Sequence, residues 1–181
     1  MATTGADAAQ HEGTTVSGGN ILSMLAAMGP FRRTGERILA DHGIRDVTAE
    51  GWYPLDAYVR SLDTIEAKMG PNTLYQVGKE IPNHIMLPPG LDTFPVVIGS
   101  FEPAFAMNHR GWAGVPISHR VTGPKSGVII SATPYPCDFD RGVIQGFFTK
   151  LLGARLKVEH DPTKECKKKG GRSCTHIVSE F

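Results

Sequence analysis

The chain has 181 residues, of which 40% are hydrophobic, and its 19 Lys and Arg against 18 Asp and Glu give a formal charge of +1. A chain of this length forms one compact domain with a substantial core and needs no disulfide support. The near-neutral charge argues against bulk nucleic-acid binding, and no stretch reaches the roughly 20 apolar residues of a membrane-spanning helix. Three cysteines are an odd number, which excludes a fully paired disulfide framework.

The first 19 residues are small and polar, and Val16 is their one β-branched apolar residue. Such a segment cannot bury enough surface to offset the entropy lost on ordering. We therefore predict a disordered leader over residues 1–19 and a single domain over residues 20–181. The leader also lacks the apolar centre of a signal peptide, so we expect a cytoplasmic protein.

Helical periodicity dominates the first part of this domain. Apolar residues recur at helical spacing across residues 31–42 and 54–69, and a shorter helix is predicted over residues 73–81. Glycine or proline follows each of these segments and is a typical helix stop. A further helix is expected from Val96 to about His109, despite Pro103.

The pattern changes to strands after Pro116. Residues 117–123 and 126–134 are rich in β-branched residues and flank a Gly-Pro-Lys turn, which predicts an antiparallel hairpin. Apolar residues every four positions then predict a helix over residues 138–152, and strands are expected over 154–160 and 175–179. This order predicts an α+β fold in which helices pack on a small antiparallel β-sheet.

The three cysteines come together in such a fold. Cys137 precedes the helix over residues 138–152, while Cys166 and Cys174 flank the tip KKKGGRS between the last two strands. In a reducing compartment, three thiolates favour zinc, which takes a fourth nitrogen or oxygen ligand in tetrahedral geometry. The alternative is three buried, inert thiols.

Strand alternation suggests the fourth ligand. His160 shares a strand face with the apolar residues of its segment and is our first choice. His176 lies two residues after the last cysteine on the same face and remains an alternative, as do Glu159 and Glu165. Four protein ligands leave no open position for water, so we expect a structural zinc ion.

Residues 128–179 resemble the carboxy-terminal part of 4-vinyl reductase-type domains, small-molecule-binding modules that also occur in phenol-sensing bacterial activators. In those sensors, a Cys before a helix and two Cys eight positions apart bind zinc together with a Glu. Cys137, Cys166 and Cys174 match the three cysteine positions. The position of the Glu is occupied by Thr163, so the resemblance leaves the fourth ligand open.

The longer order of segments is similar to an uncharacterised myxobacterial family related to that domain. The segments that carry this similarity are GERILADHGI, YPLDAYVRSLD, LYQVGKEI and YPCDFDRGVIQG. The resemblance covers residues 16–181 and implies the fold shared by nitric-oxide-signalling and Golgi-transport domains, which often pair into dimers. It also implies hydrophobic or aromatic ligands, haem, or protein partners, and the fold alone does not choose among these.

Helices packed over a sheet can enclose a mostly apolar ligand cavity. Its expected lining residues are Phe101, Phe105, Trp112, Tyr135, Phe147 and Phe148. Plain core packing is the alternative for each of them. His84, His109 and His119 are candidates to orient a ligand or coordinate haem iron, although no haem-binding spacing supports that interpretation.

Positive charge gathers near the last hairpin, where residues 155–172 hold seven basic and three acidic residues. The five at the tip are Lys164, Lys167, Lys168, Lys169 and Arg172. They form either a docking surface for an anionic partner or a solvated tip. Asp138 and Asp140, nearby, are interpreted as capping and first-turn residues of the following helix.

The sequence holds no Gly-rich phosphate loop, GxSxG elbow or HExxH helix, so an enzyme is not the expected function. The leading hypothesis is a zinc-stapled sensor domain that holds a hydrophobic or aromatic ligand between helices and sheet and signals through a homodimer or a partner protein. One alternative is an accessory or catalytic subunit of a tetrapyrrole vinyl reductase. Another is a protein-interaction scaffold like the Golgi-transport subunits.

Overall fold

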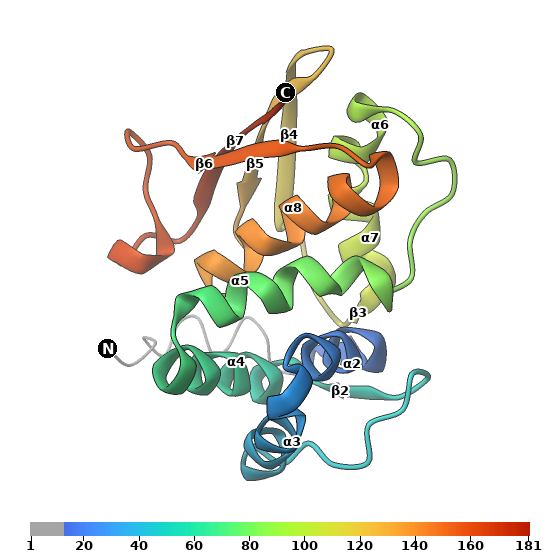
Figure 1. The fold of residues 1–181 in the computed structure, drawn as a ribbon, viewed down its shortest axis with the longest axis vertical. Coiled ribbons are helices and arrows are strands. Elements are labelled where there is room, and N and C mark those ends of the chain that lie inside the picture. The colour runs from blue at the N-terminus through green and yellow to red at the C-terminus, as the bar shows by residue number, and fades with distance from the viewer. Residues whose placement is uncertain (1–12) are drawn as a thin grey trace.

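Helices fill the first part of the described chain and the larger sheet fills the second (Figure 1). The computed structural model describes residues 13–181. The α-helices are α2 (Gly18–Ala27), α3 (Arg32–Asp41), α4 (Leu55–Met69), α5 (Pro71–Glu80), α6 (Phe94–Gly99), α7 (Phe101–Asn108) and α8 (Cys137–Leu152). The strands are β1 (Thr15–Ser17), β2 (Trp52–Pro54), β3 (His109–Arg110), β4 (Ile117–Gly123), β5 (Ser126–Ser131), β6 (Leu156–His160) and β7 (Cys174–Glu180). Short 3-10 helices are η1 (Gly29–Phe31), η2 (Ile81–Asn83) and η3 (Lys167–Lys169).

The larger sheet is antiparallel throughout and has the strand order β4-β5-β7-β6. A smaller antiparallel sheet has the order β2-β1-β3. Helices pack on the larger sheet, so the predicted α+β class with an antiparallel sheet is confirmed. The smaller sheet escapes sequence analysis because strands of two or three residues are too short to show alternation. Within residues 13–181, no helix combines the length and apolar character needed to cross a membrane.

Strand alternation decides which residues of the larger sheet face α8. In β7, Cys174, His176 and Val178 are fully buried, whereas Ile177 between them is 42% exposed. Strand β6 pairs with β7 so that His160 lies opposite His176. The inner face of these two strands therefore carries cysteine and histidine side chains toward the helical layer.

Helix α8 lies between the larger sheet and α5 (Figure 1). Phe147 and Phe148 belong to the core against the sheet, and Phe139 belongs to the core built with the amino-terminal helices. A Cβ atom on Gly142 would overlap the carbonyl oxygen of Tyr75 in α5, so the two helix backbones are in contact. Helix α8 thus joins the two cores.

Strand β1 (Thr15–Ser17) lies within the segment predicted to be a disordered leader. Strand β1 pairs with both β2 and β3, and its Val16 is fully buried. Its partners come from distant parts of the chain, which local composition does not reveal. The rest of the predicted leader, residues 1–12, lies outside the described residues.

The helix expected from Val96 to about His109 is in fact two helices, α6 and α7, with Ser100 between them. Pro103 is not the break, because it lies in the first turn of α7, where a missing N–H is tolerated. His109 has an extended backbone and begins β3. The other predicted helices and strands agree with the structure to within a few residues.

Candidate functional site

Four potential metal ligands converge beside the first turn of α8. Their ligand atoms, from Cys137, His160, Cys166 and Cys174, all lie within 4.8 Å of one another. Cys166 Sγ is 3.9 Å from the sulfur atoms of both Cys137 and Cys174, and His160 Nε2 is 2.7 Å from Cys137 Sγ. A tetrahedral zinc site with Zn–S bonds of about 2.3 Å has sulfur–sulfur edges of about 3.8 Å. We call these four residues the Cys3His cluster, and its donor set fits zinc.

The cluster favours an ionised thiol at Cys174. The pKa of this thiol is lowered to about 6, first by a hydrogen bond from the Cys137 thiol and then by the backbone N–H and positive charge of Lys167. That N–H donates to Cys174 Sγ over 3.4 Å. The same cysteine pair, together with burial, raises the pKa of the Cys137 thiol. The groups around Cys174 therefore favour its thiolate, which is the form of cysteine that binds metal ions.

The two glutamates considered as fourth ligands lie outside the cluster. Glu159 pairs with Lys157, its carboxylate 2.8 Å from the ammonium group. Glu165 accepts a hydrogen bond of 2.7 Å from the Ser173 hydroxyl. Both carboxylates are thus engaged elsewhere.

His176 lies beside the cluster without belonging to it. Its ring centroid is 4.5 Å from that of His160, and the side chain is fully buried. Neither of its ring nitrogens has a hydrogen-bond partner among the described residues. Burial lowers the pKa of His176 to about 4, so the ring is neutral at pH 7.

Lys167, next to Cys166 in sequence, points into the protein. Its ammonium group donates to Asp140 Oδ2 over 2.6 Å, to the Tyr135 carbonyl over 2.6 Å and to the Thr133 carbonyl over 3.2 Å. Asp140 also accepts hydrogen bonds from the hydroxyls of Ser131 and Thr133. Among the described residues, helix α8 has no side-chain cap, so the capping interpretation of Asp138 and Asp140 is wrong, but both residues lie in its first turn as expected. The Asp140 carboxylate is the centre of a buried network.

The basic hairpin tip is partly neutralised by α8. Lys168 forms an ion pair with Asp138, and Lys167 forms one with Asp140. Two of the five cations expected at the surface therefore serve to attach the hairpin to the helix, which weakens the interpretation of the tip as an anion-docking surface.

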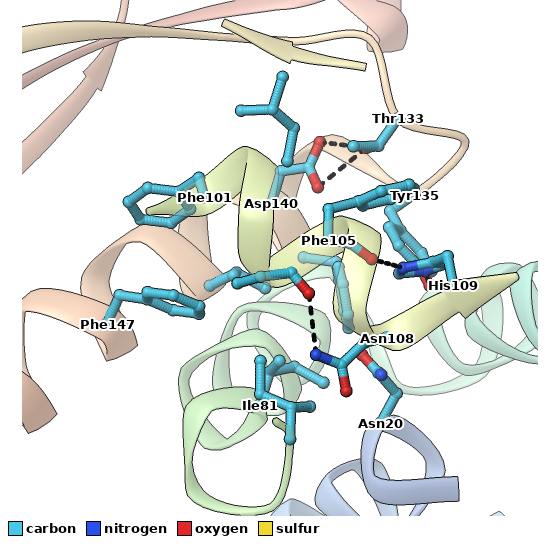
Figure 2. Close-up of a pocket in the computed structure, with 15 residues that line it drawn as sticks. Asn20, Ile81, Phe101, Phe105, Asn108, His109, Thr133, Tyr135, Asp140 and Phe147 are labelled. Atoms are coloured by element: carbon cyan, nitrogen blue, oxygen red, sulfur yellow. Dashed lines mark hydrogen bonds between the residues drawn. The ribbon is translucent and has the colours of Figure 1, made fainter. Parts of the chain in front are cut away.

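A cavity of about 50 Å³ lies between the helices and the larger sheet (Figure 2). Phe101 and Phe147 lie toward one end, and His109 and Tyr135 toward the other (Figure 2). Four of the six aromatic residues expected to line a ligand site do line this cavity, namely Phe101, Phe105, Tyr135 and Phe147. Phe148 instead packs against Phe94 in the core with the two rings tilted, and Trp112 packs edge-on against Phe105.

Several polar lining residues were not singled out as ligand-binding residues from the sequence. They are Asn20, Asn108, Thr133 and Asp140. A signal existed for Asp140, which lies three residues after Cys137 and four before Ile144 on the buried row of α8. A charged residue on an apolar row indicates a buried partner or a site. The others lie in helix ends and irregular segments without periodicity.

The polar groups of the cavity wall bind one another. His109 Nδ1 is 2.8 Å from the Phe105 carbonyl oxygen, which only accepts, so Nδ1 carries the hydrogen. His109 Nε2 must then accept the Tyr135 hydroxyl hydrogen, over 2.5 Å. The Asn108 amide bonds to Met86 N–H, Met86 C=O and Ala104 C=O. These polar groups of the wall are therefore hydrogen-bonded within the protein, and the surface that faces the cavity is largely apolar.

Haem does not fit this site. Both ring nitrogens of His109 are engaged, and burial lowers its pKa to about 4. The cavity of about 50 Å³ is far below the roughly 300 Å³ at which sites for drug-sized ligands begin. The other candidate histidines do not line the cavity: His84 contacts Ser23 and Glu80, and His119 is exposed.

Solved structures share the fold of most of this chain. One is an H-NOX protein from S. oneidensis in the Fe(II)NO ligation state, with 12% identity and a TM-score of 0.66, covering 90% of this chain and 98% of that chain. Another is an H-NOX mutant from K. algicida, with 13% identity, a TM-score of 0.59 and coverage of 91% and 96%. A third is an oxygen-binding H-NOX domain related to soluble guanylate cyclases, with 14% identity, a TM-score of 0.60 and coverage of 90% and 92%.

This chain has the H-NOX fold. The likeness supports the nitric-oxide-signalling part of the resemblance noted in the sequence, and the 4-vinyl reductase part gains no support from it. No protein-family model and no curated protein matches the sequence. At 12–14% identity the H-NOX structures establish the fold alone, because one fold can carry many functions.

Proposed function

We propose that this protein is a zinc-stapled domain that binds a small molecule between its helices and its larger sheet. The observation that carries the proposal is the convergence of four ligand atoms within 4.8 Å in the Cys3His cluster. Three sulfur atoms and one nitrogen are a donor set typical of structural zinc, because no coordination position remains for water. The zinc would tie the start of α8 to β6, to β7 and to the loop between them.

The metal would also support the cavity wall. Cys166 precedes Lys167, whose bonds to Asp140 and to the Tyr135 carbonyl brace two residues that line the cavity. Cys137 begins α8, the helix that carries Asp140 and Phe147. A cation at the cluster would therefore hold in place both the segment that carries Lys167 and the start of helix α8, which together support one side of the cavity.

The wall is largely apolar and its polar groups already bind one another, so a charged ligand would be buried without partners. The cavity therefore favours a hydrophobic ligand. A cavity of about 150 Å³ holds benzene, so the present 50 Å³ admits only a few heavy atoms. An aromatic ligand would require the stacked rings of Phe101 and Phe147, 4.5 Å apart, to move aside. H-NOX structures in an Fe(II)NO state and an oxygen complex support the use of this fold for small ligands.

We propose that the bound ligand is reported through a homodimer or a partner protein in the cytoplasm. The tetrapyrrole vinyl reductase alternative meets the same obstacle as haem, because a macrocycle exceeds the cavity. No observation on the described residues favours a scaffold function.

Native mass spectrometry and metal analysis of protein purified without added metal test the proposal. We expect about one zinc ion per chain in the wild type and its loss in Cys166→Ser. Glu165→Gln is the matched control, because Glu165 adjoins the cluster in sequence but binds Ser173. Folded wild-type protein with reduced cysteines and no metal would overturn the zinc proposal. A retained small molecule would support the ligand site.

A further inference from the structure

His176 is the most unusual buried residue of the described chain. It is 0% exposed, and both of its ring nitrogens lack a hydrogen-bond partner among the described residues. A buried polar group without a partner is destabilising, because it has lost its hydrogen bonds to water and gained none in the protein. Because such groups are rare in native proteins, an unpartnered one calls for a physical explanation, such as a bound water or ion or a functional role.

The surroundings of His176 point to the Cys3His cluster. His176 and Cys174 lie on the same face of β7, and His160 lies directly opposite His176 on β6. The two imidazole rings are 4.5 Å apart at an interplanar angle of 54°. At this centroid separation, a nitrogen at the rim of one ring can come within hydrogen-bond distance of a nitrogen at the rim of the other when the two rings are suitably rotated.

Metal binding would create the hydrogen-bond donor that His176 lacks. His160 Nε2 is the ring nitrogen that faces the cluster, 2.7 Å from Cys137 Sγ. A cation bound to Nε2 requires that nitrogen to be unprotonated, so the ring hydrogen must be on Nδ1. A histidine that binds metal almost always donates this remaining N–H to an acceptor. The buried imidazole of His176 offers a free acceptor nitrogen beside it.

We propose that His176 is a positioning residue of the metal site, accepting a hydrogen bond from Nδ1 of metal-bound His160. This inference rests on the proposed zinc site and adds a residue outside its four ligands. The hydrogen bond sets the tautomer and the orientation of the His160 ring and strengthens it as a ligand. It also explains why an imidazole occupies a fully buried position where an apolar side chain would otherwise pack.

A buried water is the competing explanation. The side-chain Nε of Arg141 is also buried without a partner, and the charge of Arg141 acts on His176. A water that joined those two groups would satisfy His176 without involving the metal. The two explanations differ in what replacement of His176 does to metal affinity.

The test measures the zinc affinity of the full chain by competition with a chromophoric chelator and its ligand set by the absorption spectrum of the Co²⁺ form. We expect His176→Leu to weaken zinc binding 10- to 100-fold while the Co²⁺ spectrum keeps the signature of three sulfurs and one nitrogen. His176→Asn and His176→Gln place an amide oxygen near one or the other ring nitrogen, and at least one should restore part of the affinity. Ile177→Leu, on the opposite face of β7, is the matched control and should match the wild type.

Unchanged zinc affinity in His176→Leu would overturn the inference and favour the buried water. Loss of the nitrogen signature from the Co²⁺ spectrum would also overturn it, because His176 would then be a ligand itself. If neither amide variant recovers affinity, the effect is one of packing, and the positioning role is excluded. Should the leucine variant fail to fold, the comparison of Asn and Gln with the wild type decides the question. Failure of the wild type to bind either metal would instead overturn the proposed zinc site, so that measurement comes first.

Discussion

His109 shows how a buried histidine can belong to a cavity wall without being available to a ligand. Its two ring nitrogens bind the Phe105 carbonyl and the Tyr135 hydroxyl, and its ring stacks on that of Phe105 with centroids 3.7 Å apart. Burial is the main cause of its low pKa, and the bond to the Phe105 carbonyl opposes it only in part. Protonation would place an uncompensated charge in an apolar wall.

This burial predicts a loss of stability in mild acid. The pKa of His109 is about 4 in the native state against a reference value of 6.5, so below pH 6.5 the unfolded chain binds a proton that the native state excludes. The contribution of neutral His109 to the free energy of unfolding is present above pH 6.5. It is lost as the pH falls to about 4, at a cost of up to about 3 kcal/mol. Urea unfolding of metal-free protein between pH 7.5 and 4.5 should therefore show a weaker pH dependence for His109→Gln than for the wild type.

His176, whose pKa is also lowered, is present in both proteins, so the difference between their pH profiles belongs to His109. Replacement of the exposed His119 by Gln is the control and should leave the profile unchanged. Parallel profiles for the wild type and His109→Gln would show that His109 does not stay neutral in the folded protein.

At the scale of elements, the contact between α5 and α8 places the cluster and the cavity relative to the amino-terminal helices. Glycines let the two backbones meet: a Cβ atom on Gly142 would overlap the Tyr75 carbonyl oxygen, and one on Gly78 would overlap the Phe139 carbonyl oxygen. Backbone atoms cannot rotate away as side chains do. The sequence shows these glycines, but their meaning depends on which helix lies opposite.

We expect Gly142→Ala to destabilise the protein by about 1–3 kcal/mol in urea unfolding, because overpacking forces the helices apart. Alanine is the better helix former by about 1 kcal/mol, so the two effects oppose each other and the clash should prevail. Gly99→Ala is the control: its Cβ would lie 3.5 Å from the nearest side-chain atom of His119, an ordinary contact. A Gly142→Ala variant as stable as the wild type would contradict the backbone contact.

At the scale of the whole molecule, Lys167 connects the last hairpin to the cavity. Its ion pair with Asp140 is largely buried, with side-chain exposures of 15% and 8%. If the proposed zinc ion is bound, its removal would free Cys166 and, with it, the segment that holds Lys167 in place. Asp140 would then be a buried carboxylate without its cation, which is costly in a low-dielectric site.

Chelation of the proposed zinc ion should therefore loosen two regions at once. We expect faster hydrogen exchange in residues 161–173 and also in residues 133–140. If free zinc is 1,000-fold above its Kd, its removal should lower the Tm by roughly 10 °C. In zinc-loaded Lys167→Met, only residues 133–140 should exchange faster, and the neighbouring Lys169→Met should behave as the wild type. Faster exchange confined to residues 161–173 after chelation would show that the cluster and the cavity are independent.

Local patterns in the sequence were sufficient for much of the fold. The four-residue repeat of α8 and the β-branched runs of β4 and β5 identify these elements, because helical and strand periods are written in consecutive residues. Strand alternation likewise pointed to His160, which the structure places among the three cysteines. The α+β fold class followed from the order of the predicted helices and strands alone.

Only the tertiary structure decided where long-range partners lie. It turned Lys167 inward to Asp140, paired His109 with Tyr135, and reduced the expected ligand site to a cavity of about 50 Å³. It also left His176 buried without a partner beside the cluster. Sequence by itself determined most of the helices and strands, since these depend on local spacing, and it singled out the three cysteines and His160 as candidate ligands. Packing between distant segments creates the cavity and the buried Lys167–Asp140 ion pair, and it places His176 beside the cluster. Local periodicity in the sequence carries no information about that packing.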